Sequence, residues 1–282
     1  MHSKERLQKR LIINADDFGL GPAINRGIIE GFENGIITNA SLSSCGVAFN
    51  EAVEFSRGRS NLGVGIHLTL NEECPISRKD KIKSLLSGDR FLNLPAFLKR
   101  FLSRRVVLEE VRLEFESQMQ RFIETGIKPT HIDSHKHIHM LPGIFEIALR
   151  LAKKYNIRSI RFSRSTMFDI LKSQGFLRAL EVFGLSTLAV LQLSKIKEYS
   201  IVVPDNCYGL MESGSLDEKQ VYYILNHIRY GASEIFCHPA NSRIEGDSLG
   251  YSRENELKAF TSGSVKELIR ELDIKLIRYD EI

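Results

Sequence analysis

Four of the eight histidines of this chain lie in one short segment, THIDSHKHIHMLP, residues 130–142. Imidazole groups bind transition metals and transfer protons near neutral pH, and carboxylates beside them can share both tasks. In an extended strand, alternate side chains point to one face, which here would carry His131, Asp133, His135, His137 and His139. A strand end with this polar face predicts a metal site rather than a packed core.

Only one or two imidazoles of this cluster are needed as metal ligands. His135 is the first candidate ligand. Asp133 and His137 would either orient a ligand or contact a substrate. We interpret His131 and His139 as structural residues.

Two adjacent carboxylates, Asp16 and Asp17, follow the apolar run at 11–15. In a regular strand they would face opposite sides. At a strand end that turns through Phe18 and Gly19, one carboxylate can bind a cation while the other stays free as a base. The alternative interpretation is a pair of helix-capping or solvated loop acids.

Three further side chains lie near the ends of predicted strands. His67 stands in GIHLTL (65–70), where a buried core histidine is the alternative interpretation. His238 precedes a proline in CHPA and could donate a proton to a leaving group. Arg161 could hold a neighbouring acid in its charged form or bind substrate. We interpret His2 and His227 as surface residues.

The composition is that of a soluble globular protein of 282 residues, with 43% hydrophobic and 26% charged residues. The net charge of +4 and the lack of a basic stripe with interleaved aromatic residues argue against nucleic-acid binding. The start of the chain has no apolar signal core, so we expect a cytoplasmic protein. Cys45, Cys74, Cys207 and Cys237 form no CxxC pair, so we expect reduced thiols, which fit a cytoplasmic location.

One apolar segment, residues 175–195, is nearly long enough to cross a membrane. Arg178, Glu181 and Gly184 argue against a span. A helix buried in the core or in a homodimer interface is the simplest interpretation. Peripheral contact with a membrane or with a lipid-linked substrate is the alternative.

Short apolar runs rich in β-branched residues alternate with amphipathic runs of helical spacing. The alternation occurs seven or eight times, which predicts an α/β fold with a parallel sheet, and the length favours a distorted (β/α) barrel. We expect a single catalytic domain over residues 1–282, with excursions at about 71–105 and 165–198. The predicted strands are 11–15, 37–44, 62–70, 130–139, 157–164, 199–203, 233–240 and 274–282.

In a parallel barrel, the carboxyl ends of the strands meet at one mouth, where active sites lie. Five candidate strand ends carry an acid, a base or a cation in this sequence. Two imidazoles and one carboxylate at such a mouth would leave metal positions open, as catalysis requires.

The blocks NADDFGL, GIHLTL, THIDSHKHIHMLP and CHPA, in this order, resemble those of the YdjC-like carbohydrate deacetylases, also called the ChbG/HpnK family. The resemblance runs almost end to end. It implies a barrel similar to that of the wider polysaccharide deacetylases, with one divalent metal ion. It also implies removal of an acetyl group from N-acetylated amino sugars such as chitooligosaccharides.

The resemblance assigns roles to five residues of this chain. It implies metal ligands at Asp17, His67 and His135, a general base at Asp16 and a general acid at His238. The identity of the ion stays open, because imidazoles favour zinc whereas a carboxylate with open positions also suits magnesium.

The substrate prediction comes from the segments 175–195 and 205–216, which look more like the hopanoid-associated branch of the family. They predict a lipid-linked N-acetylglucosamine as first substrate, with peripheral contact at the inner membrane face, and a chitooligosaccharide as second. A metal-dependent phosphoesterase is the alternative enzyme, although it would need more ligands and a histidine pair near the first strand. A non-catalytic sugar-binding module would have little use for a complete set of base, metal ligands and acid.

Overall fold

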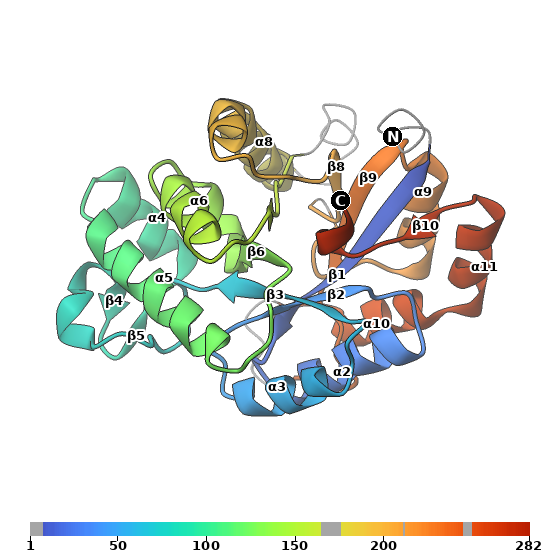
Figure 1. Cartoon of the computed structure of the whole chain (residues 1–282), viewed down its shortest axis with the longest axis horizontal. Coiled ribbons are helices and arrows are strands. Elements are labelled where there is room, and N and C mark those ends of the chain that lie inside the picture. The colour runs from blue at the N-terminus through green and yellow to red at the C-terminus, as the bar shows by residue number, and fades with distance from the viewer. Residues whose placement is uncertain (1–7, 165–175, 211, 245–249) are drawn as a thin grey trace.

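The computed structural model describes residues 8–164, 176–210, 212–244 and 250–282 (Figure 1). Within them a parallel sheet has the strand order β7-β6-β3-β2-β1-β9-β8, and β10 pairs with the start of β1. The strands are β1 (Lys9–Phe18), β2 (Asn39–Leu42), β3 (Gly63–Leu68), β6 (His131–Ser134), β7 (Ser159–Ile160), β8 (Asn206–Tyr208), β9 (Gly231–Cys237) and β10 (Lys275–Leu276).

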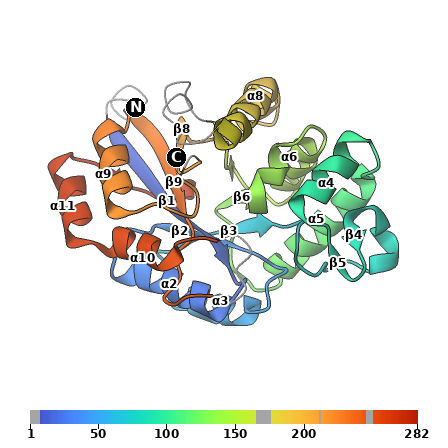
Figure 2. The same cartoon turned by 180° about the vertical axis from the view of Figure 1, so that it is seen from behind.

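Helices connect and cover these strands, as the alternation in the sequence predicts. They are α2 (Pro22–Glu33), α3 (Phe49–Arg57), α4 (Leu94–Leu102), α5 (Leu108–Ile123), α6 (Ile144–Lys154), α8 (Phe176–Glu198), α9 (Glu218–His227), α10 (Arg253–Thr261) and α11 (Gly263–Glu271). Figures 1 and 2 show the sheet curled between them, with α2, α3 and α10 below it and α8 beside its upper rim. The predicted α/β class and distorted barrel are confirmed.

The curled sheet does not close by a ladder between β7 and β8 in the described part of the chain. The segment 199–203, which we expected to be a strand, makes a single bridge from Val202 to Ser159. That expectation was wrong. Ser200 has a left-handed backbone (φ 53°), and Pro204 lacks the amide hydrogen that a ladder needs, so pairing starts again only at β8.

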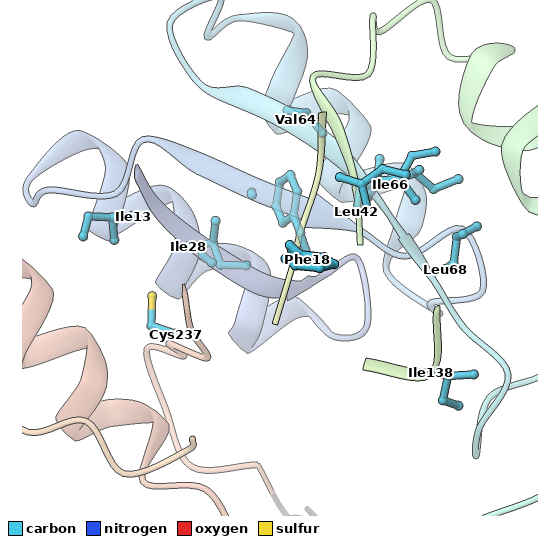
Figure 3. Packing of buried hydrophobic residues seen from close by; sticks show 14 of the residues in the cluster. Ile13, Phe18, Ile28, Leu42, Val64, Ile66, Leu68, Ile138 and Cys237 are labelled. Carbon is cyan, nitrogen blue, oxygen red and sulfur yellow. The ribbon is translucent and has the colours of Figure 1, made fainter. Parts of the chain in front are cut away.

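The two faces of the sheet differ in chemistry. The face toward the helices is apolar: Figure 3 shows Ile13, Phe18, Leu42, Val64 and Ile66 packed there near Ile28 of α2. The other face is equally buried but polar, and many of its side chains hydrogen-bond to one another. Its members include Asn14, Asp16, Asn39, Ser41, His67, His131, Asp133, Arg161 and Glu234.

Close packing on the polar face requires a glycine in β3. A Cβ atom on Gly65 would lie 2.3 Å from the ring of His131 on the neighbouring strand. The glycine therefore leaves room for a buried imidazole in the middle of the sheet.

The two expected excursions differ in content. The region 71–105 contains a short hairpin, β4 (Leu86–Ser87) with β5 (Arg90–Phe91), two single 3₁₀ turns and α4. In the second excursion, 165–175 lies outside the described residues and the rest is α8. In the described part of the chain, no helix combines the length and the hydrophobicity needed to cross a membrane.

Candidate metal and catalytic site

Asp16 and Asp17 lie at an irregularity near the end of β1. The register between β1 and β2 shifts between Ala15 and Phe18. Asp17 has a left-handed backbone (φ 69°), which aspartate tolerates better than most residues. This distortion brings the two adjacent carboxylates into one buried site, which a regular strand would prevent.

The Asp17 carboxylate lies between two imidazoles. Its Oδ1 atom is 3.1 Å from Nδ1 of His135, the first residue after β6, and 3.6 Å from Nε2 of His67 in β3. All three side chains are buried. Two ligands of one metal ion, each about 2.1 Å from it, lie roughly 3–3.5 Å apart at ordinary coordination angles. The two distances from Asp17 are therefore close to the spacing of ligands of one metal ion, and all three donor atoms lie within 4.8 Å of one another.

His67 is oriented by a carboxylate behind it. Its Nδ1 atom lies 2.8 Å from Oδ1 of Asp133 on the neighbouring strand, and its buried Nε2 atom has no hydrogen-bond partner among the described residues. Burial lowers the pKa of His67, but Asp133 and then Asp16 and Asp17 raise it to about 9. A cation, either a proton or a metal ion, is thus favoured at Nε2, and the carboxylate–histidine pair is typical of metal sites.

Arg161, just after β7, is fully buried and binds three carboxylates. Its Nη1 and Nη2 atoms donate to both oxygens of Asp16, at 2.6 and 2.7 Å. Nη1 also lies 2.8 Å from Asp133, and Nε donates to Glu234 of β9 at 2.8 Å. A bidentate guanidinium fixes the Asp16 carboxylate in orientation.

His238 follows β9 and also lies near Asp16. Its Nε2 atom is 4.0 Å from Oδ2 of Asp16, and its Nδ1 atom is 3.9 Å from Oε2 of Glu256. Burial lowers the pKa of His238 to about 4, so the imidazole is neutral near pH 7. Glu256 accepts hydrogen bonds from the backbone N–H groups of His238 and Leu216, and burial raises its pKa to about 7.

Three charged residues of the site were missed in the sequence. Arg253, at the start of α10, donates to Oδ2 of Asp17 at 2.9 Å and to the His238 carbonyl. Burial raises the pKa of Asp17, but Arg253 and His135 together hold it well below its usual range. Glu234 could have been identified from the sequence, because a charged residue inside an apolar strand indicates a buried polar site. Arg253 and Glu256 lie in an ordinary polar helix, whose sequence gives no such indication.

The histidine segment does not form the extended strand that we predicted. β6 ends at Ser134, and His135–Met140 forms a 3₁₀ turn in which Lys136 and His137 have φ values of 54° and 55°. The prediction that alternate side chains beyond Ser134 share one face of a strand was therefore wrong. His135 still reaches Asp17, while His137 hydrogen-bonds to Ser163 at 2.8 Å.

The other histidines make structural contacts or lie at the surface. His131 stacks on Tyr279 with ring centroids 3.9 Å apart and lies 3.0 Å from Ser41 Oγ. His139 bridges Ser134 and the Arg161 carbonyl. His227 is exposed, and His2 lies outside the described residues.

Buried acidic groups outnumber buried arginines around the site. Five buried carboxyl groups face two buried guanidinium groups: Asp16, Asp17, Asp133, Glu234 and Glu256 against Arg161 and Arg253. Buried charges of one sign are costly unless they are paired. Protons on Glu256 and His67, whose pKa values are raised to about 7 and about 9, would offset part of this surplus. A divalent cation beside Asp17 and His67 would do so in place of the His67 proton, so the charges fit a metal ion.

A cavity of about 190 Å³ opens onto these groups. Its polar wall contains Asp16, His67, His135 and His238, and its apolar wall contains Leu94, Val182, Leu185 and Leu210. Polar groups that converge under an apolar rim are typical of a small-molecule site.

Comparisons with known proteins match nearly the whole chain. The sequence model of the family described as YdjC-like protein matches residues 10–271. A carbohydrate deacetylase of Clostridium beijerinckii is 32% identical over 279 residues, which are 97% of this chain and all of the relative. A chitooligosaccharide deacetylase of Escherichia fergusonii is 33% identical over 280 residues, 98% of this chain and 100% of that protein.

A solved structure is also similar. The crystal structure of a proposed cellobiose-phosphate cleavage protein from Enterococcus faecalis V583 has a TM-score of 0.76 at 29% identity. The likeness covers 97% of this chain and 98% of that one.

Proposed function

This chain belongs to the YdjC-like family, and on that premise we propose that it is a metal-dependent carbohydrate deacetylase. It would hydrolyse the N-acetyl group of an N-acetylated amino sugar to acetate and a free amine. The observation that carries the proposal is the juxtaposition of three metal-donor side chains with an arginine-bound carboxylate and a buried histidine. All of these except Asp17 line one cavity. The names of the curated relatives support the carbohydrate and the acetyl group.

Asp17, His67 and His135 would hold the metal ion, either Mg²⁺ or Zn²⁺. A divalent ion there would polarise the acetamide carbonyl and lower the pKa of water. Asp133 would keep Nε2 of His67 directed at the ion, and Arg253 would hold the second oxygen of Asp17 away from it.

The proton transfers fall to Asp16 and His238. Asp16, held by Arg161, would take the proton of the water that attacks the acetyl carbon. The leaving nitrogen must be protonated as its bond to that carbon breaks. Because His238 is neutral near pH 7, the proton that it delivers would come from the attacking water by way of Asp16, with one further water bridging the 4.0 Å between the two side chains. His137, on the cavity wall, would contact the sugar.

Two substrates are the candidates, a chitooligosaccharide and a lipid-linked N-acetylglucosamine. The Escherichia fergusonii relative supports the first. The second is supported by α8, because Val182 and Leu185 line the cavity while Phe183, Val190 and Leu191 of the same helix are exposed. An apolar helix face beside the cavity would let a lipid-bound sugar enter from the inner membrane surface.

The test is acetate release by the purified chain reconstituted with Mg²⁺ or Zn²⁺. Diacetylchitobiose and a lipid-linked N-acetylglucosamine are supplied separately, each with and without EDTA. We expect EDTA-sensitive acetate from one of them, which names the substrate class. Absence of acetate from both, with the metal shown to be bound, would contradict the proposal and would turn attention to phosphoesters.

Membrane contact by α8 is tested by liposome co-sedimentation. We expect binding by the wild type and loss of binding in the Val190→Asp, Leu191→Asp double variant. Equal, negligible binding by both proteins would contradict membrane docking, and sedimentation velocity would then show whether α8 pairs two copies of the chain instead.

A further inference from the structure

A second and larger cavity, of about 800 Å³, lies at the other side of the sheet, where its strands begin. Its wall is made by the three loops that lead into β3, β6 and β7 and by the segment after β10. These loops precede the strands, whereas the candidate catalytic groups lie at or beyond the strands' carboxyl ends. The two cavities are therefore separated by the length of the sheet.

The wall of this second cavity is strongly basic. It contains five cationic side chains, Arg57, Arg59, Lys128, Arg158 and Arg278, against one acidic side chain, Asp280. Three of the five cations already have acidic partners, in the pairs Arg57–Glu54, Arg59–Glu33 and Arg278–Asp280. Lys128 and Arg158 form no ion pair with any residue that the structure describes. Two cations at one cavity are thus left to bind an anion.

Neutral hydrogen-bonding groups accompany these two cations. The Asn156 amide, on a residue with a left-handed backbone (φ 56°), and the Ser60 hydroxyl both line the cavity. Neither side chain has a hydrogen-bond partner among the described residues. A guanidinium, an ammonium and neutral donors together suit an oxyanion with two charges better than a single carboxylate.

The size of the cavity argues for more than a bare ion. Small-molecule sites commonly enclose about 300–1,000 Å³. Apolar surface from Leu62, Val64 and Ile127 also contributes to the wall. A ligand that combines an anionic group with an uncharged body would contact both the basic and the apolar parts of the wall.

We propose that this cavity is a binding site for a small phosphorylated molecule, whose phosphate is held by Lys128 and Arg158. The proposal is independent of the deacetylase proposal, since it uses none of the same residues. The ligand would join the amino ends of β3, β6 and β7. A ligand that binds only the folded chain should raise its thermal stability.

The test uses the full-length, metal-loaded protein with three probes: inorganic phosphate, AMP and adenosine. Binding is measured by titration calorimetry and by the shift in the unfolding midpoint. The variant is Lys128→Gln, Arg158→Gln. The matched control is Lys99→Gln, Arg105→Gln, which removes the same charge from exposed positions in α4 and in the loop after it.

We expect phosphate and AMP to bind the wild type and the control, and to bind the Lys128/Arg158 variant at least tenfold more weakly. Adenosine should bind none of them measurably. Phosphate binding of equal strength in the variant would place the anion elsewhere, for example at the metal site, and would overturn the proposal. No binding of phosphate or AMP to the wild type, or equal binding of AMP and adenosine, would also overturn it. Because the substituted side chains are exposed and unpaired, we expect the variant to fold as the wild type does.

Discussion

Two arginines three positions apart, at the two ends of β7, have opposite environments. Arg158, before the strand, is exposed and forms no ion pair in the described part of the chain. Arg161, after the strand, is fully buried and contacts Asp16, Asp133 and Glu234. The same contrast holds across the sheet. Buried acids lie at the carboxyl ends of its strands, whereas exposed cations lie near the amino ends. Arg161 therefore has a structural role, whereas Arg158 is available to bind a ligand.

The largest effect should come from Asp16, the carboxylate that Arg161 holds. Asp16→Asn keeps the size of the side chain but removes the base, so we expect kcat for acetate release to fall by about 10²–10⁴-fold. Metal binding, measured by calorimetry, should be retained because Asp16 is outside the Asp17–His67–His135 set. A kcat within a few-fold of wild type would show that Asp16 is not the base.

Arg161→Gln should be the most destabilising change at the carboxyl ends of the strands. It leaves three buried carboxylates without their shared cation, and breaking a buried ion pair in this way costs about 3–5 kcal/mol. Denaturant unfolding of the metal-free protein measures the effect. A loss below about 1 kcal/mol would mean that the carboxylates are stabilised by other groups.

Asp133→Asn should weaken metal binding rather than remove it. The carboxylate lies 2.8 Å from His67 Nδ1, and loss of such a supporting group lowers metal affinity about 10–100-fold. Competition with a zinc-binding dye gives the affinity. Unchanged zinc affinity would contradict the assignment of His67 as a ligand oriented by Asp133.

His139 should contribute to the loss of stability in acid. Burial lowers its pKa to about 4, below the ordinary value of about 6.5, so the unfolded chain binds this proton first as the pH falls. The wild type therefore loses about 1.4 kcal/mol per pH unit between pH 6.5 and 4 through this group. In His139→Gln that contribution is absent, so the stability gap between the two proteins should narrow as the pH falls. A constant gap in urea unfolding over this window would contradict the prediction.

Arg158→Gln should have the smallest effect on stability, in contrast to Arg161→Gln. An exposed arginine without an ion pair contributes little to folding, so the free energy of unfolding should change by less than about 0.5 kcal/mol. The measurement is the same denaturant titration as for Arg161→Gln. A loss of several kcal/mol would show that the two ends of the strands do not differ as described.

Local patterns in the sequence were sufficient for the parallel α/β fold. Apolar runs and helical spacing depend on which face of each element is buried, and that is encoded within each element. The polar residues at the strand ends could be identified from this alternation, whereas the order of the strands in the sheet is seen only in the structure. His67 and His135, together with the Asp16–Asp17 pair, could therefore be named before any coordinates were known, although their roles came from the family resemblance.

Only the tertiary structure decided how these groups meet. The left-handed backbone at Asp17 arises where β1 shifts register against β2, and the turn after Ser134 replaces a strand that the alternation predicted. Arg253 reaches Asp17 from 236 positions along the chain. The partner of a buried charge is selected by three-dimensional proximity and by the cost of leaving that charge unpaired. The spacing of residues along the chain does not contain this information, so the charged groups that complete the site became visible only in the folded protein.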